Sequence, residues 1–272
     1  MKKLFHVLAQ MPPWKGEETL VFNLGKKYCC FAVSSTVGKQ LYELAYYTTD
    51  EVNESMLNQL MTLHPELRQS FKKVLVNYDQ AQIILLPASK FKNENALLLL
   101  HAMYSVGNRS TVLTEPVKEN EAYAVYAVPE AIHNWVLTNY PTAVYGHSCR
   151  SGIKTIPNEN VTGCIRADFG TEQFSVIVSK GDQLFLVQTF PYSTPDDVMY
   201  YLLKTCQQFS LSALEVKLVL SGLIEKQSAL FHELYQYFIN IEFKNADWTV
   251  NEDNEYPLHF FASLNEFIQC ES

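Results

Sequence analysis

The chain has 272 residues, of which 47% are apolar, and its 21 basic and 29 acidic side chains give a formal net charge of −8. That length suits one large domain or two ordinary ones, with enough apolar material for a core. No basic cluster interrupts this acidic composition, so we expect no surface that follows the phosphates of a nucleic acid. The longest apolar runs fall far short of the roughly 20 residues that a membrane span requires, so no span is predicted.

Six cysteines are scattered along the chain, at 29, 30, 149, 164, 206 and 270. Most lie in apolar patterns typical of strands or helices, which favours small buried residues in a reducing compartment over disulfides. The opening segment MKKLFHVLAQMPPW is basic at its start, but its apolar part is too short for a cleaved signal peptide. We therefore predict a cytoplasmic protein.

The first part of the chain has the pattern of strands followed by a helix. β-branched and aromatic residues between turn-forming residues indicate strands, and apolar residues at helical spacing indicate helices. The strands expected here cover 4–9, 19–23, a hairpin partner ending near 34, and 40–47, and a helix is expected at 50–63. Further elements are expected as strands at 74–77, 82–86, 111–116, 122–128 and 142–147, and as helices at 93–104 and 129–139.

The second part is dominated by 163–191, GCIRADFGTEQFSVIVSKGDQLFLVQTFP, which predicts three strands joined by two tight turns. Gly170 and Gly181 supply the backbone freedom that sharp turns need. A helix at 194–209 follows, because Thr194 can cap it and Pro195 suits its first turn. A strand at 216–220, a helix at 226–238 and a strand at 239–243 complete the series βββαβαβ, and LHFFASLNEFIQC is expected to form a closing strand and helix.

The two parts share an internal pattern. Residues 20–34, LVFNLGKKYCCFAVS, align without a gap with residues 165–179, IRADFGTEQFSVIVS, so that Asn23 meets Asp168 and Gly25 meets Gly170. Identity is low, but each segment is followed by a third strand, a helix and a strand–helix–strand series. We interpret this as an internal duplication.

The first copy is longer than the second. If the fourth strand of the first copy is 122–128, residues 48 to 120 separate its third and fourth strands. In the second copy, residues 191 to 215 separate the corresponding strands. We place an insert near 64–120, and either 74–77 or 122–128 is the true fourth strand. The loop-like segment 152–160 separates the copies, which predicts domains at 1–157 and 158–272.

This arrangement resembles the duplicated ribonuclease-H-like architecture of actin, sugar kinases, the large heat-shock chaperones and the actin-like proteins of cell division and type IV pilus assembly. In sequence detail it resembles a bacterial family of unknown function placed with that fold, from about residue 19 onward. The resemblance implies an α/β protein with the actin-like fold, built from two βββαβαβ halves with an insert in the first.

In that superfamily ATP lies between the halves, two hairpin loops bind its phosphates, and a Gly-Gly turn meets the adenosine. Carried over, the first loop contains Asn23, Gly25, Lys26 and Lys27, the second contains Asp168, Gly170 and Thr171, and the adenosine turn is Ser221-Gly222. Each departs from the family pattern: Asn23 lacks the charge that holds hydrated Mg²⁺, Glu172 opposes phosphate, and Ser221 replaces a glycine.

The missing carboxylate matters most, because phosphoryl transfer depends on positioned charge. The resemblance therefore favours a non-catalytic scaffold or protein-interaction module, with no cofactor, no catalytic residue and another protein as its partner, bound through the first half or its insert. The alternative is a nucleotide-binding ATPase or kinase that uses ATP and Mg²⁺ through the Asp168 loop.

A remote alternative is a serine hydrolase at Ser148. The segment Gly146-His147-Ser148-Cys149-Arg150 approaches the G-x-S-x-G nucleophile elbow, and acids (Asp196, Asp197) and histidines (His232, His259) follow in triad order. Arg150 replaces the last glycine, where the tight turn disfavours a long side chain. A polar strand end is the simpler interpretation.

Metal-ligand spacing is absent from the sequence. The seven histidines, at 6, 64, 101, 133, 147, 232 and 259, form neither H-E-x-x-H nor paired Cys/His motifs. The sequence therefore predicts no metal site.

Overall fold

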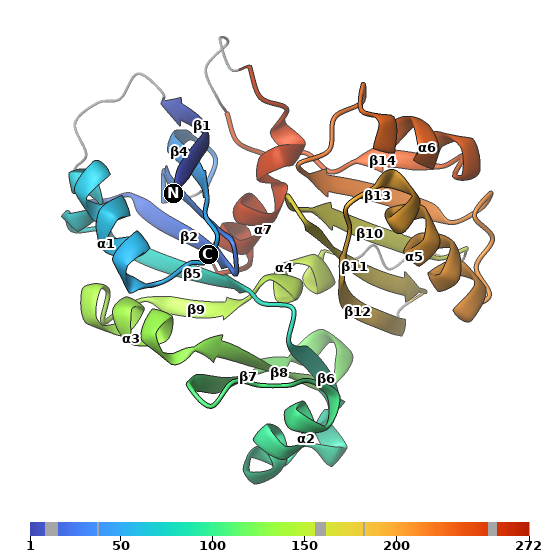
Figure 1. The fold of residues 1–272 in the computed structure, drawn as a ribbon, viewed down its shortest axis with the longest axis horizontal. Helices are drawn as coiled ribbons and strands as arrows, with labels where there is room; N and C mark the ends of the chain where they lie inside the picture. Colours follow the sequence, from blue (N-terminus) through green and yellow to red (C-terminus); the bar gives the residue numbers. More distant parts are fainter. Residues whose placement is uncertain (9–15, 37, 156–161, 182, 250–254, 272) are drawn as a thin grey trace. The chain divides into compact units, whose positions relative to one another are not determined.

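The computed structural model describes residues 1–8, 16–36, 38–155, 162–181, 183–249 and 255–271. The chain divides into two compact units. Unit 1 comprises Met1–Ser148, Trp248–Asn254 and Phe267–Ser272, and unit 2 comprises Cys149–Asp247 and Glu255–Glu266. Figure 1 shows that each unit contains a sheet with helices packed against it. Among the described residues, no helix combines the length and the apolar character needed to cross a membrane.

Unit 1 is built on a six-stranded sheet with the order β1-β4-β3-β2-β5-β9. Its strands are β1 (Lys2–Leu8), β2 (Thr19–Gly25), β3 (Tyr28–Ser34), β4 (Leu41–Thr48), β5 (Lys73–Asp79) and β9 (Val144–His147). The first four pair antiparallel, whereas β5 runs parallel to β2, and β9 runs parallel to β5. Every residue of β2 and β3 is buried, as expected of central strands covered on both faces.

Helices α1 (Glu54–Leu63) and α3 (Glu130–Asn139) pack together in unit 1 (Figure 1). Asn53 caps α1, because its side chain accepts a hydrogen bond from the Met56 N–H. The two helices are joined by Trp135, whose indole N–H donates to Asn58 at 2.9 Å. The same indole packs edge-on against Phe22 of β2, so α3 is held on the central sheet.

A second, three-stranded sheet in unit 1 resolves which segment is the fourth strand of the first copy. It has the order β6-β8-β7, formed by β6 (Ile83–Pro87), β7 (Ser110–Val117) and β8 (Ala122–Pro129). Helix α2 (Ala96–Met103) packs on β8 through the buried Ala96 and Leu100. Because β5 pairs with β2 and β8 belongs to this extra sheet, the fourth strand is β5.

Unit 2 has a five-stranded sheet with the order β12-β11-β10-β13-β14. The strands are β10 (Cys164–Phe169), β11 (Gln173–Lys180), β12 (Gln183–Pro191), β13 (Lys217–Gly222) and β14 (Ile241–Phe243). Strands β10 to β12 pair antiparallel, and β13 runs parallel to both β10 and β14. This order and these directions match β4-β3-β2-β5-β9 of unit 1, so the repeated topology expected from the sequence is present.

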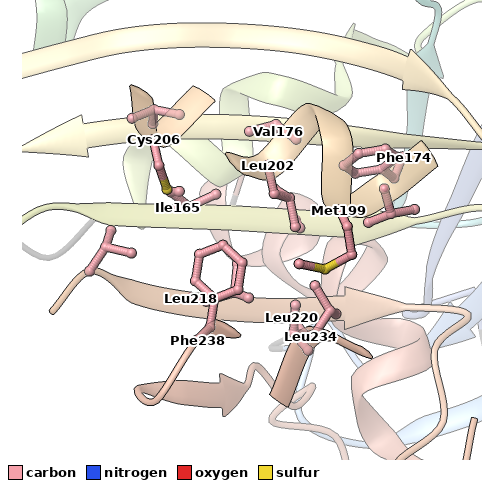
Figure 2. Close-up of a cluster of buried hydrophobic side chains, with 14 of the residues drawn as sticks. Ile165, Phe174, Val176, Met199, Leu202, Cys206, Leu218, Leu220, Leu234 and Phe238 are labelled. Atoms are coloured by element: carbon pink, nitrogen blue, oxygen red, sulfur yellow. The ribbon is translucent and has the colours of Figure 1, made fainter. Parts of the chain in front are cut away.

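The core of unit 2 lies between its sheet and helices α5 (Pro195–Gln208) and α6 (Ala229–Tyr237). Figure 2 shows Met199, Leu202 and Cys206 of α5 pointing onto strand residues such as Ile165 and Leu218. The start of α5 follows the sequence expectation: Thr194 and Asp197 form a capping box, with Pro195 in the first turn.

The remaining elements connect or close the sheets. They are α4 (Ser148–Lys154), α7 (Ala262–Cys270) and the 3-10 turns η1 (Pro65–Arg68), η2 (Ala88–Lys90), η3 (Asn93–Asn95), η4 (Lys118–Asn120) and η5 (Leu258–Phe261). The strand expected at the start of LHFFASLNEFIQC was wrong, because this stretch forms η5 and continues into α7. The six cysteines carry thiols that form no disulfide, and all except Cys270 are buried.

Candidate functional site

The structure pairs two polar residues at the same place in each sheet. In unit 2, Asp168 of β10 faces Ser221 of the neighbouring parallel strand β13. In unit 1, the corresponding residue Asn23 of β2 faces Asn77 of β5. Each pair is hydrogen-bonded: Ser221 Oγ donates to Asp168 Oδ1 at 2.5 Å, and Asn77 Nδ2 donates to Asn23 Oδ1 at 3.4 Å.

The first pair brings together two residues that the sequence assigned to different parts of a nucleotide site. The resemblance places Asp168 in a phosphate-binding loop and Ser221 in the turn that meets adenosine, yet the two side chains bind each other. A hydrogen bond to a carboxylate is stronger than one between neutral groups, so this contact holds Asp168 against β13. Ser221 is also buried, with only 6% of its surface exposed.

The second loop is closed by contacts within unit 2. The Gly170 N–H donates to the Gln173 carbonyl at 2.8 Å, which forms the turn between β10 and β11. Tyr192 anchors this turn, since its hydroxyl donates to the Gly170 carbonyl at 2.6 Å and its N–H donates to the Glu172 carbonyl at 2.9 Å. Burial raises the pKa of Tyr192, so the hydroxyl stays neutral and remains a donor. Thr171 lies exposed at the tip.

Backbone packing within unit 2 explains why residue 222 is a glycine, without a ligand. Its φ of +77° lies in the left-handed region, and a Cβ at this position would overlap the backbone of Phe169. The next residue, Leu223, donates its N–H to the Phe169 carbonyl at 2.7 Å. The close approach of β13 to β10 therefore requires glycine here.

The first loop is covered by Tyr28. A Cβ on Gly25 would overlap the Tyr28 ring, so the ring lies directly over this glycine. Lys26 and Lys27 are exposed, and their carbonyls accept hydrogen bonds from Val52 and Thr49 at 2.9 Å each. The loop is thus held by the segment that leads into α1.

Sequence reasoning missed the carboxylate beside this loop, Asp79. It ends β5 and faces Gly25 in the parallel pair β2–β5. Both of its oxygens accept hydrogen bonds, from the Tyr28 hydroxyl at 2.6 Å and from the Ser148 hydroxyl at 2.7 Å. The signal is an aspartate at the end of a strand, but it becomes informative only once 73–79 is known to be the strand beside β2.

Ser148, the candidate nucleophile, begins α4 and donates to Asp79. The adjacent His147 donates from Nε2 to the Gln80 carbonyl at 2.7 Å, and burial lowers the pKa of this imidazole. The other residues considered for a triad also have local structural roles. Asp197 belongs to the capping box of α5, His232 binds the Ser228 carbonyl, and His259 binds the Ile224 carbonyl. These contacts give no support to the hydrolase alternative.

Comparison with solved structures identifies proteins that share the fold of this chain. The chain is similar to a Bacteroides thetaiotaomicron protein with actin-like ATPase fold and unknown function, with a TM-score of 0.76, 17% identity, and coverage of 94% of this chain and 96% of that one. It is also similar to a chain of the PilM–PilN type IV pilus biogenesis complex, with a TM-score of 0.60, 15% identity, and coverage of 94% and 99%. The ethanolamine utilization protein EutJ from Carboxydothermus hydrogenoformans follows with a TM-score of 0.51, 8% identity, and coverage of 97% and 92%.

These likenesses establish the α/β actin-like fold that the sequence predicted, and at such low identity they establish the fold alone. No curated protein matches the chain. Residues 14–241 match the family described as "Protein of unknown function (DUF3822)", which agrees with the expected family of unknown function. The chain therefore belongs to the DUF3822 family and has the actin-like ATPase fold.

Proposed function

We propose that this protein is a non-catalytic member of the actin-like fold that acts by binding another protein. Its two halves, 1–157 and 158–272, keep the duplicated architecture, while its loops have lost the groups that ATP and Mg²⁺ require. The single observation that carries the proposal is the state of Asp79, because both of its oxygens are bound by hydroxyl groups of the protein itself.

Magnesium sites need carboxylate oxygens that are free to accept a hydrated ion. Asn23, at the position expected to serve the metal, is neutral, and its amide is paired with Asn77. Asp79 is the carboxylate beside the first loop, and Tyr28 and Ser148 occupy it. The Tyr28 ring also fills the space over Gly25 that a phosphate would need. The first loop is therefore a poor fit for a Mg²⁺-phosphate group.

The contacts of the second loop also support the loss of nucleotide binding. Asp168 binds Ser221 in place of a ligand, and Gly222 is explained by its contact with the Phe169 backbone. Glu172 is exposed on this loop and would repel phosphate. The residues carried over from the superfamily thus serve the packing of unit 2, which supports the loss of nucleotide chemistry over an ATPase or kinase at the Asp168 loop.

The surface that favours a protein partner lies on α2. This helix, ALLLLHAM, contains no acidic residue, lysine or arginine, and it buries only Ala96 and Leu100 against the extra sheet. On its other faces Leu97, Leu98 and Met103 are 48%, 69% and 69% exposed. Clustered exposed apolar side chains of this kind mark interaction surfaces. Full burial of each is worth about 1.5–3 kcal/mol, so a partner with an apolar segment would gain measurable affinity here.

The PilM–PilN complex supports this assignment by analogy. A chain of that complex aligns over 99% of its length with this protein, and it was solved together with a protein partner. We infer that the DUF3822 chain likewise binds a protein, and that α2 and the sheet it covers form the docking surface of the first half.

The nucleotide part of the proposal is tested by titrating ATP with Mg²⁺ into the protein in a calorimeter. We expect no saturable heat at micromolar to millimolar concentrations. Binding with micromolar affinity that is lost in Asp168→Ala would overturn the proposal in favour of the nucleotide-binding alternative. Asp196→Ala is the matched control, because this aspartate is exposed in the first turn of α5.

The partner is tested with a photo-crosslinking amino acid placed at Leu98 in the native host. The same amino acid at Leu214, which is 62% exposed in unit 2, serves as control. A protein crosslinked at 98 but not at 214 should bind the purified chain, and Leu98→Glu should weaken that binding by about 10-fold or more. A partner whose binding is indifferent to changes throughout 64–120 would contradict the proposed surface.

A further inference from the structure

The structure gathers two histidines and a glutamate into one cluster in unit 1. His6 lies on the edge strand β1, Glu43 lies on the neighbouring strand β4, and His64 lies just after α1. One ligand atom from each of the three falls within 4.8 Å of the others. We propose that His6, Glu43 and His64 form a zinc-binding site that pins the edge strand of the sheet to the end of α1.

The distances support this geometry. His6 Nε2 lies 2.9 Å from Glu43 Oε1, and His64 Nδ1 lies 3.3 Å from the same oxygen. In a tetrahedral zinc site with bonds of about 2.0–2.1 Å, neighbouring ligand atoms are about 3.3 Å apart. The two separations from Glu43 Oε1 are thus close to the edge length of such a tetrahedron, the third is within 4.8 Å, and small rotations of the side chains would admit the ion.

The set of donors is also the right one. Imidazole nitrogens and one carboxylate are the ligands of many zinc sites that keep a fourth position for water. Glu43 Oε1 already lies within hydrogen-bond distance of a nitrogen of both imidazoles, so one carboxylate oxygen faces both candidate nitrogen ligands. Glu66, whose carboxylate lies 2.8 Å from His64 Nδ1, is a candidate fourth ligand.

Tyr47 is a positioning residue for the cluster. Its hydroxyl lies 2.7 Å from His64 Nε2, on the opposite side of the ring from Glu43. A hydroxyl can donate to this nitrogen when Nδ1 carries the proton, and it can accept from an Nε2–H when Nδ1 binds metal. Zinc-bound histidines regularly have their second nitrogen fixed in this way. The Phe31 ring, 4.7 Å from His64 between centroids, further restrains the imidazole.

The cluster is both enclosed and reachable. Glu43 and His64 are buried, with side chains 4% and 7% exposed, whereas the side chains of His6 and Glu66 are each 27% exposed. An ion can therefore approach the cluster from the side of His6 and Glu66. The ligands are 37 and 21 positions apart along the chain, which explains why no short motif revealed them.

The site is tested with the metal-free full-length chain, prepared with a chelator and titrated with Zn²⁺ and with Co²⁺. We expect one zinc ion per chain with a micromolar or tighter Kd, an intense visible spectrum of tetrahedral Co²⁺, and a Tm at least about 5 °C higher at 100-fold excess of free zinc over Kd. His6→Gln and His64→Gln should each weaken zinc at least 10-fold. Tyr47→Phe should weaken it about 10–100-fold.

His101→Gln is the matched control, because this histidine is exposed on α2 in the same unit. His6 is partly exposed on an edge strand, so its variant should keep the Tm of the metal-free protein and report on metal alone. Absence of saturable zinc binding below about 100 μM would overturn the proposal, and the cluster would then be an ion pair of the fold. Binding that survives both histidine variants unchanged would place the zinc elsewhere and overturn it equally.

Discussion

The hydrogen bond from Tyr28 to Asp79 should contribute measurably to the stability of unit 1. The change to make is Tyr28→Phe, which removes one oxygen and keeps the ring. That ring is 8% exposed and stacks on Tyr46, with 5.0 Å between centroids and 5° between planes. Its packing should therefore persist in the variant, so the measured effect reports on the hydroxyl and the carboxylate that it binds.

The magnitude follows from the charge on the acceptor. Hydrogen bonds to charged groups contribute about 1.5–3 kcal/mol, and Asp79 would keep its second bond from Ser148. With a urea m-value of about 2 kcal/mol/M, the midpoint should fall by roughly 0.7–1.5 M. In a cycle with Asp79→Asn, the coupling free energy between the two positions should be about 1 kcal/mol or more.

The assay is urea unfolding followed by tryptophan fluorescence. Trp135 and Trp248, the two tryptophans among the described residues, belong to unit 1, which is the unit that contains the contact. A coupling free energy below about 0.3 kcal/mol would show that Tyr28 does not hold Asp79 in solution. The proposed non-catalytic role would then lose its main support, which is the pairing of Asp79 with hydroxyl groups of the protein.

Three further outcomes are expected in unit 2. Gly222→Ala should destabilise unit 2 by about 3 kcal/mol or more, because strain at positive φ is added to overlap with the Phe169 backbone. Gly181→Ala should cost only about 1–2 kcal/mol, because Gly181 has a φ of +59° but open space around it. Resistance to protease digestion should distinguish the two variants. Leu202→Ala in α5 should cost about 2–5 kcal/mol in thermal unfolding, since this side chain is fully buried. Burial lowers the pKa of His259 below 6.5, so the unfolded chain binds a proton more readily than the folded one, and stability should fall as the pH drops below 6.5. His259→Gln should reduce that loss of stability, measured by urea unfolding at pH values above and below 6.5.

The order and type of the elements were largely accessible from the sequence because the signals are local. The turn at Gly170 and the cap at Thr194 act within a few residues, and the expected elements around them match β10, β11 and α5. The one strand that failed, at the start of LHFFASLNEFIQC, is an aromatic run whose pattern suits a strand. It follows Pro257 and forms the turn η5 instead, so the tertiary setting overrode the local propensity.

The candidate site was less accessible because it depends on which strands pair. Residues 74–77 and 122–128 are both apolar and β-branched, and no local signal tells a strand of the central sheet from a strand of an inserted one. The pairing of β5 with β2 decides that Asn77 meets Asn23 and that Asp79 meets Gly25. Without that register, Asp79 is one acidic residue among 29, and the cover provided by Tyr28 cannot be inferred.

The two hydrogen-bonded pairs explain how a duplicated fold can keep its architecture while its loops take on a different role. Asn23 with Asn77, and Asp168 with Ser221, link the first hairpin strand of each unit to the parallel strand beside it. A nucleotide loop at these positions would direct such polar groups to phosphate, whereas here the paired side chains bind each other. Pairing the groups with each other satisfies them within the sheet, which supports the proposed loss of nucleotide binding. The same side chains that suggested a nucleotide loop in the sequence therefore serve as cross-strand contacts, which fits the proposal that this protein acts through the surface of α2.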